Sequence, residues 1–397
     1  MVAQDSCGSF VKVGATGGDG SQSAPFGSIV EAIEHDATFI YVCQDSDDTP
    51  SMGPVHIPAG VRLFGGLSCD DWRYHDEGRS RITATAPDIP VIFDAGAGAA
   101  LDGFLIEGPV PASPGDSSIG LIADHAVASL TRVDIVTHDG ADGAPGVAGM
   151  DGDSGEDGAP GTIVGPGDGG LGCSNNDGGH GGFTDSGANT TVSTNGEPPG
   201  LGGQALDVGT CGDVSGSDGA PATDGTLPDG IGSISNTGYT PRTGTDGMDG
   251  AIGGGGAGGS GLTNQGGGGG GGGGCGGKGG KAGGPGGSSI AILWLDANVV
   301  FDQCTISVGA GANGGTAGLG GKGGSGGAAG ANFQGACVGG NGGDGSDGGA
   351  GAPGAGGHSL IIAYTGDTAP DPQGITADDP TTAGEVGGVA ARMLEFP

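Results

Sequence analysis

The sequence predicts an all-β fold, namely a parallel β-helix with a short N-terminal capping helix, interrupted by glycine-rich insertions of polyglycine-II helix. Three observations carry this prediction. Short apolar runs rich in Val and Ile, broken by Gly, Asp and Pro, follow one another through residues 39–136. A stretch of the chain recurs without gaps 171 residues later. Between the apolar runs, glycine occupies every third position in separate blocks.

Composition limits the classes of protein that fit. Of 397 residues, 103 are Gly and 23 are Pro, which indicates disorder when it has no period and a three-fold helix when it has one. Forty-six acidic residues against eleven basic ones give a formal charge of −35, which argues against nucleic acid and anionic membranes as partners. No apolar run approaches the length of a membrane-spanning helix, so we expect no membrane insertion.

The repeat defines the β-coils. Residues 117–143 align with residues 288–314, with 8 of 27 positions identical. A further copy lies 29 residues upstream, a third echo lies at 357–366 and a weaker one at 202–210. A unit of three short strands that repeats in this way is typical of a parallel β-helix, where each coil is buried only by stacking on the next. The interior residues expected from the alignment are Ile119, Ile135, Ile290 and Ile306.

A capping helix is predicted ahead of the coils. Phe26, Ile29, Val30 and Ile33 form one apolar helical face within residues 24–36. Because the end of a β-sheet stack needs cover, we expect this helix to close one end of the β-helix.

The glycine blocks predict a bundle. A three-fold helix has no internal hydrogen bonds, so its backbone groups must bond to neighbouring segments. Blocks 315–330 and 339–357 flank a short connection, which predicts an antiparallel hairpin; the nearly pure glycine block 268–286 is expected at the centre and the acidic block 140–161 outside. Disordered loops and a collagen trimer are the alternatives. The glycines expected to be structural are Gly143, Gly146, Gly149, Gly152, Gly318, Gly321, Gly324 and Gly345.

The domain boundaries follow from these blocks. We expect β-helix coils with the capping helix at 1–139, a glycine-rich insertion at 140–287, a further coil at 288–310, a second glycine hairpin at 311–357, a final strand at 358–366 and a Pro/Asp/Thr-rich tail at 367–397. The sequence leaves open whether residues 162–243 are ordered.

Several motifs resemble a known family. The stretches GSQSAPFGSIVEAI, YVC, IPAGVRLFGGLSCDDW, RSRIT and SSIGLI resemble the pectin-lyase-like β-helix proteins common in myxobacteria and related bacteria, which are mostly secreted or surface proteins. The resemblance covers residues 7–143, 288–314 and 357–366 and implies a fold, not an activity. The glycine blocks resemble the bundles of some arthropod antifreeze proteins and of some phage tail-tip adhesins.

Catalysis is not expected. Members of the resembled family that cleave polysaccharides need paired carboxylates or calcium-binding aspartates with a basic residue on adjacent coils. The best local cluster is Arg132, Asp134, His138 and Asp139, with Asp302 nearby in the alignment. The positions aligned with the cluster in the next copy supply no second carboxylate; they are Gln303, Thr305, Gly309 and Ala310. We therefore predict that the protein is not an enzyme and assign no catalytic residue.

Metal binding is only weakly indicated. Residues 151–158 offer closely spaced carboxylates but depart from the EF-hand loop, and residues 342–347 begin like a calcium-binding nonapeptide repeat and then fail. The candidate ligands are Asp151, Asp153, Asp157, Asp344 and Asp347. We prefer the interpretation that these aspartates are solvent-facing surface residues. No cofactor is therefore expected, and calcium binding is left as an alternative.

The cysteines indicate an oxidising compartment. Eight are present and none forms a CxxC pair, which favours four disulfides of undetermined pairing over zinc, with buried free thiols as the alternative. They are Cys7, Cys43, Cys69, Cys173, Cys211, Cys275, Cys304 and Cys337. We expect a secreted or cell-surface location, although the chain carries no signal sequence.

These features together predict a non-catalytic secreted or cell-surface structural or adhesive protein. A polysaccharide-active β-helix enzyme and an ice-binding protein are the alternatives. No specific partner can be named; polysaccharide, other cell-surface components and self-assembly are left open.

Overall fold

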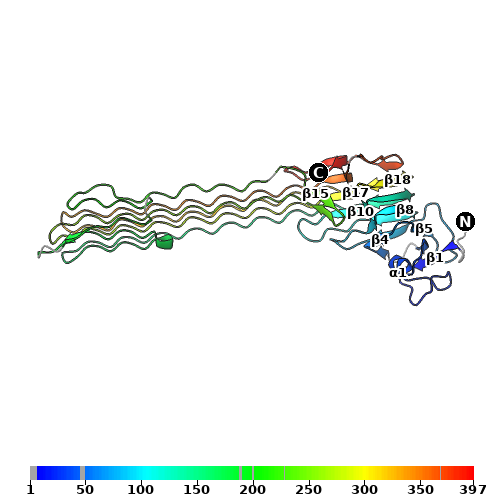
Figure 1. The fold of residues 1–397 in the computed structure, drawn as a ribbon, viewed down its shortest axis with the longest axis horizontal. Coiled ribbons are helices and arrows are strands. Elements are labelled where there is room, and N and C mark those ends of the chain that lie inside the picture. The colour runs from blue at the N-terminus through cyan, green and yellow to red at the C-terminus, as the bar shows by residue number, and fades with distance from the viewer. Residues whose placement is uncertain (1–6, 45–49, 187–189, 199–200, 228, 367) are drawn as a thin grey trace.

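The computed structural model describes residues 7–44, 50–186, 190–198, 201–227, 229–366 and 368–397. Stacked β-coils form a block at one end of the molecule, and a long shaft of extended glycine-rich segments projects from it (Figure 1). The first described residues lie in the block, at the end away from the shaft, and the C-terminus lies where the shaft begins.

In the described part of the chain, the block consists of three parallel sheets of six strands each. Sheet I contains β1 (Ser9–Lys12), β2 (Phe39–Cys43), β5 (Arg62–Leu67), β8 (Gly96–Asp102), β11 (Ala126–Thr131) and β18 (Asn298–Asp302). Sheet II contains β4 (Val55–Ile57), β7 (Val91–Phe93), β10 (Ser118–Asp124), β17 (Ser289–Leu295), β20 (Ser359–Thr365) and β22 (Ala390–Glu395). Sheet III contains β3 (Ser51–Met52), β6 (Ser80–Thr83), β9 (Phe104–Glu107), β12 (Asp134–Val136), β19 (Cys304–Ser307) and β21 (Ile375–Ala377).

Successive coils visit the sheets in the order II, I, III, as in β10–β11–β12 and β17–β18–β19. The predicted all-β class is confirmed, and the stacked parallel strands are compatible with a parallel β-helix. The repeat matches the register: Leu130 pairs with Leu101 on one side and with Phe301 on the other, and Ile135 pairs with Ile106 and Ile306. The echo at 357–366 also pairs, through β20 with β17. The echo at 202–210 was wrong, because those residues form no strand and lie in the shaft.

The coil interior is apolar and closely packed. Ile135 and Ile306 belong to this core, as predicted. Ile119 and Ile290 are also buried but belong to a second cluster with Leu293 and Leu360, on the opposite face of sheet II. The prediction that they point inward was wrong, because a strand buried on both faces is continuously apolar and its alternation no longer identifies the inner face.

A hairpin from within the glycine-rich insertion covers this outer face of sheet II. Its strands are β15 (Ser233–Ser235) and β16 (Gly238–Thr240), and Ile234 and Tyr239 pack on the second cluster beside Phe396. The last segment of the chain was expected to be a tail, but it contributes β21 and β22 to sheets III and II.

The N-terminal end is covered by α1 (Ile29–Glu34), as expected. Ser28, the N-cap residue, accepts a hydrogen bond from the Glu31 amide, and the Glu31 carboxylate accepts one from the amide of Gly27, the residue before the N-cap, so two amides at the start of the helix have side-chain partners. The helix is shorter than predicted, and Val30 is 38% exposed instead of facing the core, because Phe26 precedes the helix and bridges to β1.

Candidate functional site on the glycine-rich shaft

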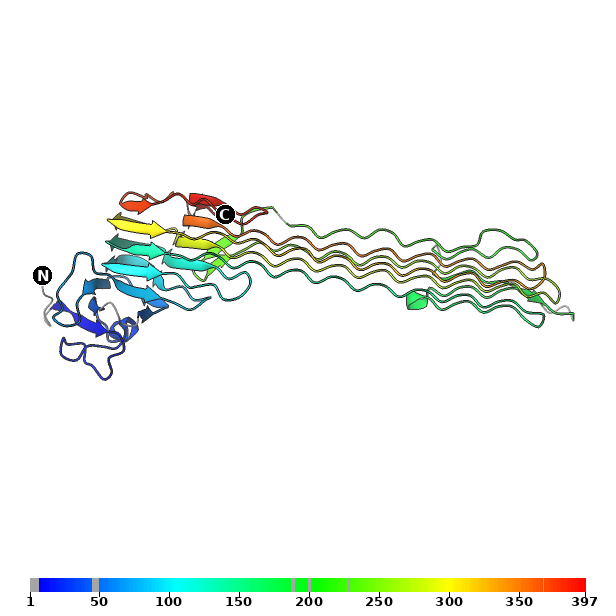
Figure 2. The same ribbon diagram turned by 180° about the vertical axis from the view of Figure 1, so that it is seen from behind.

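The shaft is made of extended segments that run back and forth between the coils and a free end (Figure 2). Long segments span its whole length: 140–161, 212–227, 243–261, 266–287, 310–330 and 339–357. Within the described residues, shorter segments occur only in the far half: 167–172, 176–182, 193–197 and 201–206. Each long excursion from the coils leaves after a strand of sheet III and returns before a strand of sheet II.

The segment 266–287 is the centre of the shaft. In its far half, the amides of Gly269, Gly270 and Gly271 donate to three different segments, and their carbonyls accept from three others. The acceptors are the oxygens of Ala159, Gly179 and Gly340, and the donors are the amides of Gly330, Gly170 and Gly256, at N–O distances of 2.8–2.9 Å. Three consecutive residues therefore hold six neighbouring segments, and no backbone group of these three is left without a partner.

Glycine is required by the spacing between segments. A Cβ on Gly271 would lie under 3.0 Å from the Gly327 carbonyl oxygen, closer than real Cβ atoms approach. The same holds, against a backbone carbonyl oxygen of a neighbour, for every glycine that the sequence singled out: Gly143, Gly146, Gly149, Gly152, Gly318, Gly321, Gly324 and Gly345. None of these has a positive φ, so the constraint is one of distance between backbones and not of dihedral freedom.

The hairpin of blocks 315–330 and 339–357 is antiparallel, as expected. Gly339 donates to Gly330, Gly345 to Gly324, and Gly354 to Gly315, so one partner number rises as the other falls. Block 140–161 lies against block 310–330 in the parallel sense, from Gly143 with Asn313 to Gly161 with Ala331.

Aspartates of the shaft bond to the backbone of a neighbouring segment. Where Asp151 precedes Gly152, the Gly152 amide donates to the Lys322 carbonyl while the Asp151 carboxylate accepts from the Lys322 amide at 2.7 Å. In the same way, the Gly158 amide donates to the Ala328 carbonyl, and the Asp157 carboxylate accepts from the Ala328 amide. Between antiparallel segments the two bonds go to different residues of the neighbour. The Gly348 amide donates to the Gly321 carbonyl, while the carboxylate of the preceding Asp347 accepts from the amide of Gly323, two residues after Gly321.

This bonding changes the interpretation of the calcium candidates. Asp151, Asp157, Asp344 and Asp347 each accept a backbone N–H, which gives these side chains a structural role. Asp153 directly follows a periodic glycine, Gly152, instead of preceding one, and its side chain is exposed. In the described part of the chain, no group of three or more His, Cys, Asp or Glu residues could hold a metal ion.

Two ion pairs mark the near half of the shaft, where the shorter segments are absent. Lys281 Nζ lies 2.8 Å from Asp246, and Lys278 Nζ lies 2.9 Å from Asp249. The same two aspartates accept the Ala282 and Gly279 amides. The hydrogen bond from Lys281 lowers the pKa of the Asp246 carboxyl. In the near half of segment 266–287, these carboxylates accept the amides of Gly279 and Ala282. The amides in the same phase in the far half, such as that of Gly270, donate to a carbonyl of another segment instead.

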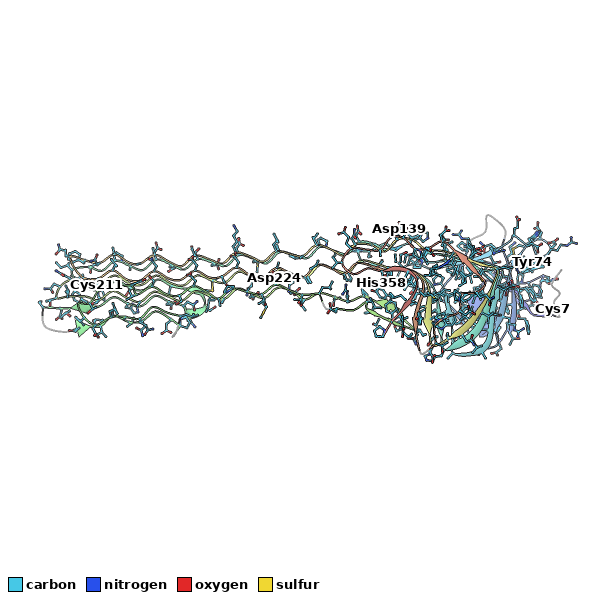
Figure 3. The ribbon with its side chains drawn as sticks, turned by 90° about the horizontal axis from the view of Figure 1, so that it is seen from above. Cys7, Tyr74, Asp139, Cys211, Asp224 and His358 are labelled. Carbon is cyan, nitrogen blue, oxygen red and sulfur yellow. A yellow bond between two sulfur atoms is a disulfide. The ribbon has the colours of Figure 1, made fainter. Side chains whose placement is uncertain are left out.

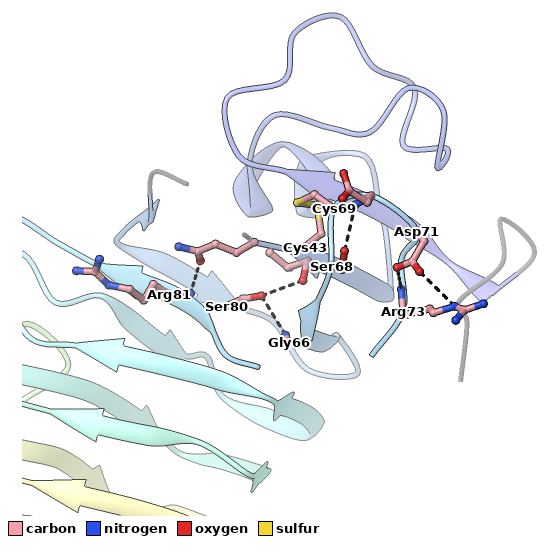
Figure 4. Close-up of a disulfide and its surroundings, with 11 residues drawn as sticks. Cys43, Gly66, Ser68, Cys69, Asp71, Arg73, Ser80 and Arg81 are labelled. Carbon is pink, nitrogen blue, oxygen red and sulfur yellow. Dashed lines mark hydrogen bonds and ion pairs between the residues drawn. A yellow bond between two sulfur atoms is a disulfide. The ribbon is translucent and has the colours of Figure 1, made fainter. Parts of the chain in front are cut away.

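Three disulfides fasten the molecule at different levels. Cys43–Cys69 lies in the coils (Figure 4), Cys173–Cys275 lies part-way along the shaft, and Cys211–Cys337 lies near the free end (Figure 3). The prediction of four disulfides was wrong, because Cys7 and Cys304 are free. Cys304 takes an apolar core position stacked on Val133, and burial raises the pKa of its thiol. Cys7 is exposed at the far end of the coils (Figure 3).

The charged residues expected on the coils form ion pairs with partners from other coils, and the Arg79–Asp134 and Arg132–Asp102 pairs lie close enough for the Arg79 charge to act on Asp102. Asp134 pairs with Arg79 at 3.0 Å, and Arg132 pairs with Asp102 while its guanidinium lies over the Tyr74 ring. His138 Nε2 lies 3.4 Å from a Glu107 oxygen, and the Asp139 carboxylate accepts the Ala310 amide. Burial raises the pKa of Asp102, and the nearby carboxylate of Asp302 acts in the same direction. The partners Arg79 and Asp102 were missed because they come from other coils.

The free end of the shaft contains a cavity of about 300 Å³. One wall is formed by Thr184 of β13 (Phe183–Thr184), by β14 (Thr190–Thr191) and by the residues that follow β14, and the other wall is the turn 205–208. Ser260 and Gly261 of the long segment 243–261 also line it. This cavity could not be predicted from the sequence, because its walls come mostly from residues 162–243, and the sequence left open whether these are ordered.

Comparison of the chain with family models, with curated proteins and with solved structures returns no match. Within the described residues, no helix is long and apolar enough to cross a membrane.

His358 holds the junction of coils and shaft (Figure 3). The side chain is buried; Nδ1 accepts the Val389 amide at 3.0 Å, so Nε2 carries the proton toward the Ile231 carbonyl at 2.8 Å. It thus connects β20 with the C-terminal segment and with the approach to β15. Burial lowers the pKa of His358, and Arg242 adds to this, while burial raises the pKa of Tyr239 beside it to about 12.

The neutral state of His358 predicts a pH dependence. The unfolded state binds a proton below its ordinary pKa of about 6.5, whereas the folded state binds one only at lower pH. Stability from this group is therefore full above about pH 6.5 and falls as the pH drops below it. We expect thermal unfolding between pH 8 and 5 to show a steeper loss for the native chain than for His358→Gln, which does not titrate. Parallel profiles would contradict this assignment.

The packing of the shaft predicts unequal costs at adjacent residues. Gly321→Val should destabilise strongly, because its Cβ would meet the Met150 carbonyl and separate segments whose bonds contribute about 0.5–1.5 kcal/mol each. Lys322→Val should be mild, because that side chain is exposed. Thermal unfolding of both variants checks this, and equal, negligible shifts would mean that the block is not packed.

Proposed function

We propose that this protein is a non-catalytic structural and adhesive module, secreted or held at a cell surface. In this proposal a pectin-lyase-like parallel β-helix is the base, and a rigid bundle of polyglycine-II helices presents the free end of the shaft at a distance. The observation that carries the proposal is the central segment, whose residues Gly269–Gly271 bond to six neighbours.

The bonding pattern supports the polyglycine-II assignment. Neighbours recur every third residue: Gly269, Gly272 and Cys275 donate in turn to Ala159, Glu156 and Asp153 of one segment. A three-fold helix rises about 3.1 Å per residue, so segment 140–161 spans about 65–70 Å. A bundle of this length, with bonds in six directions at its centre, is stiff enough to act as a spacer.

Charge and disulfides support the location. Disulfides in the coils, part-way along the shaft and near the free end are typical of proteins that function in an oxidising compartment. The formal charge of −35 keeps such rods apart in solution.

The two alternatives have less support. For catalysis, Asp102 and Asp134 are each paired with an arginine and so are engaged in ion pairs, not set opposite each other across a substrate groove. For ice binding, the outward positions of segment 140–161 carry Val147, Met150, Asp153 and Glu156 in sequence, which is not a uniform row of small hydroxyl residues.

The adhesive function predicts that contact is made by the free end. Beads coated with the chain through a C-terminal tag, which lies at the base of the shaft, are tested for retention on whole bacterial cells and on insoluble polysaccharides. Replacement of residues 204–210, which contain the turn 205–208, by two glycines should abolish retention, because this turn forms one wall of the cavity at the free end. Replacement of the exposed Val147 and Met150 on the side of the shaft by Asp should leave it unchanged. No retention of native beads, or equal retention of both variants, would contradict the proposal.

A further inference from the structure

The cavity at the free end has walls that are held in place before any ligand arrives. The Asn195 Oδ1 accepts the Ala205 amide at 2.7 Å, which ties one wall to the other. Ser260 Oγ accepts the Gly209 amide at 2.6 Å, which ties the turn to the long segment beneath it. The Cys211–Cys337 disulfide fixes the chain directly after this turn. A preformed cavity spares a ligand the cost of ordering its own site.

The lining of the cavity combines hydroxyl and small aliphatic groups. Thr190, Thr191 and Ser193 are among the residues that line the cavity, and a hydroxyl group can both donate and accept hydrogen bonds. Val192 and Leu206 contribute apolar surface between them. Such a mixture matches a ligand whose surface alternates hydroxyl groups with C–H faces, which is the character of a sugar ring.

Charge and size narrow the ligand further. Among the described residues, the lining contains one carboxylate, Asp207, and no Lys, Arg or His, and the chain as a whole is strongly acidic, so an anionic ligand is repelled. The volume of about 300 Å³ lies at the small end of ligand-binding cavities, which suits a short piece of a polymer rather than a folded domain.

We infer that this cavity binds a short stretch of a neutral saccharide. The inference rests on the proposed adhesive function and names its ligand class. The described residues of the lining include no aromatic side chain on which a sugar ring could stack, so binding at one site is weak, and firm attachment comes from many shafts acting together.

Titration of the full chain with soluble saccharides tests the inference. The probes are maltotriose, triacetylchitotriose and mannotriose as neutral saccharides, trigalacturonate as the anionic one, and a triserine peptide as a hydroxyl-rich ligand of another class. At least one neutral trisaccharide should bind with a Kd of about 1 mM or tighter, and trigalacturonate should bind at least about tenfold more weakly.

Two matched variants locate the binding. Val192→Trp adds a bulky ring at the lining of the cavity and should weaken binding by at least about tenfold, whereas Val147→Trp, on the exposed side of the shaft, should leave it unchanged. Thr191→Val keeps the shape but removes a hydroxyl and should weaken binding without changing thermal unfolding.

Three outcomes overturn the inference: no neutral trisaccharide binds at about 10 mM, binding survives Val192→Trp in a folded variant, or trigalacturonate or the peptide binds best. Retention of coated beads that depends on the 204–210 turn, without binding of any neutral trisaccharide, would leave the adhesive function standing and remove this ligand class alone.

Discussion

The architecture depends on one constraint: a three-fold extended chain cannot hydrogen-bond to itself, so each amide and carbonyl must find a partner on another segment. At the centre of the shaft this is met by six surrounding segments around Gly269–Gly271. Where fewer segments surround the chain, aspartate carboxylates such as those of Asp246 and Asp249 accept the remaining amides. Glycine content, acidic composition and the arrangement of hairpins therefore answer the same physical requirement.

The coils set the register of the shaft. The 171-residue offset that stacks Ser118 on Ser289 continues outward, where Asp151 bonds to Lys322 and Asp157 to Ala328 at the same separation. The parallel segments 140–161 and 310–330 begin in two coils that already lie side by side, so their alignment is inherited from the sheets. The hairpin β15–β16 and His358 then close the junction by covering sheet II.

The fold could be predicted where the signal is local and periodic. The strand repeats placed Leu130 over Leu101 and under Phe301, and the glycine phase led to the antiparallel hairpin of blocks 315–330 and 339–357. What escaped prediction depends on contacts between distant residues. The outer face of sheet II, buried by Tyr239, and the aspartate bonds could be assigned only once the neighbours were known, although Asp or Asn before a periodic glycine was a visible signal. The cavity at the free end could not be predicted from the sequence, because the residues that form its walls follow no periodic pattern.

The most direct measurement of the central claim is hydrogen exchange of the backbone amides, resolved by NMR on the intact, oxidised chain. The account predicts strong protection for the amides of residues 266–274, whose donors bond within the bundle, and fast exchange in the turn 163–165. Protection comparable to that of the β17 amides would establish the shaft as hydrogen-bonded structure. Exchange of residues 266–274 at the rate of an unstructured glycine chain would contradict the account.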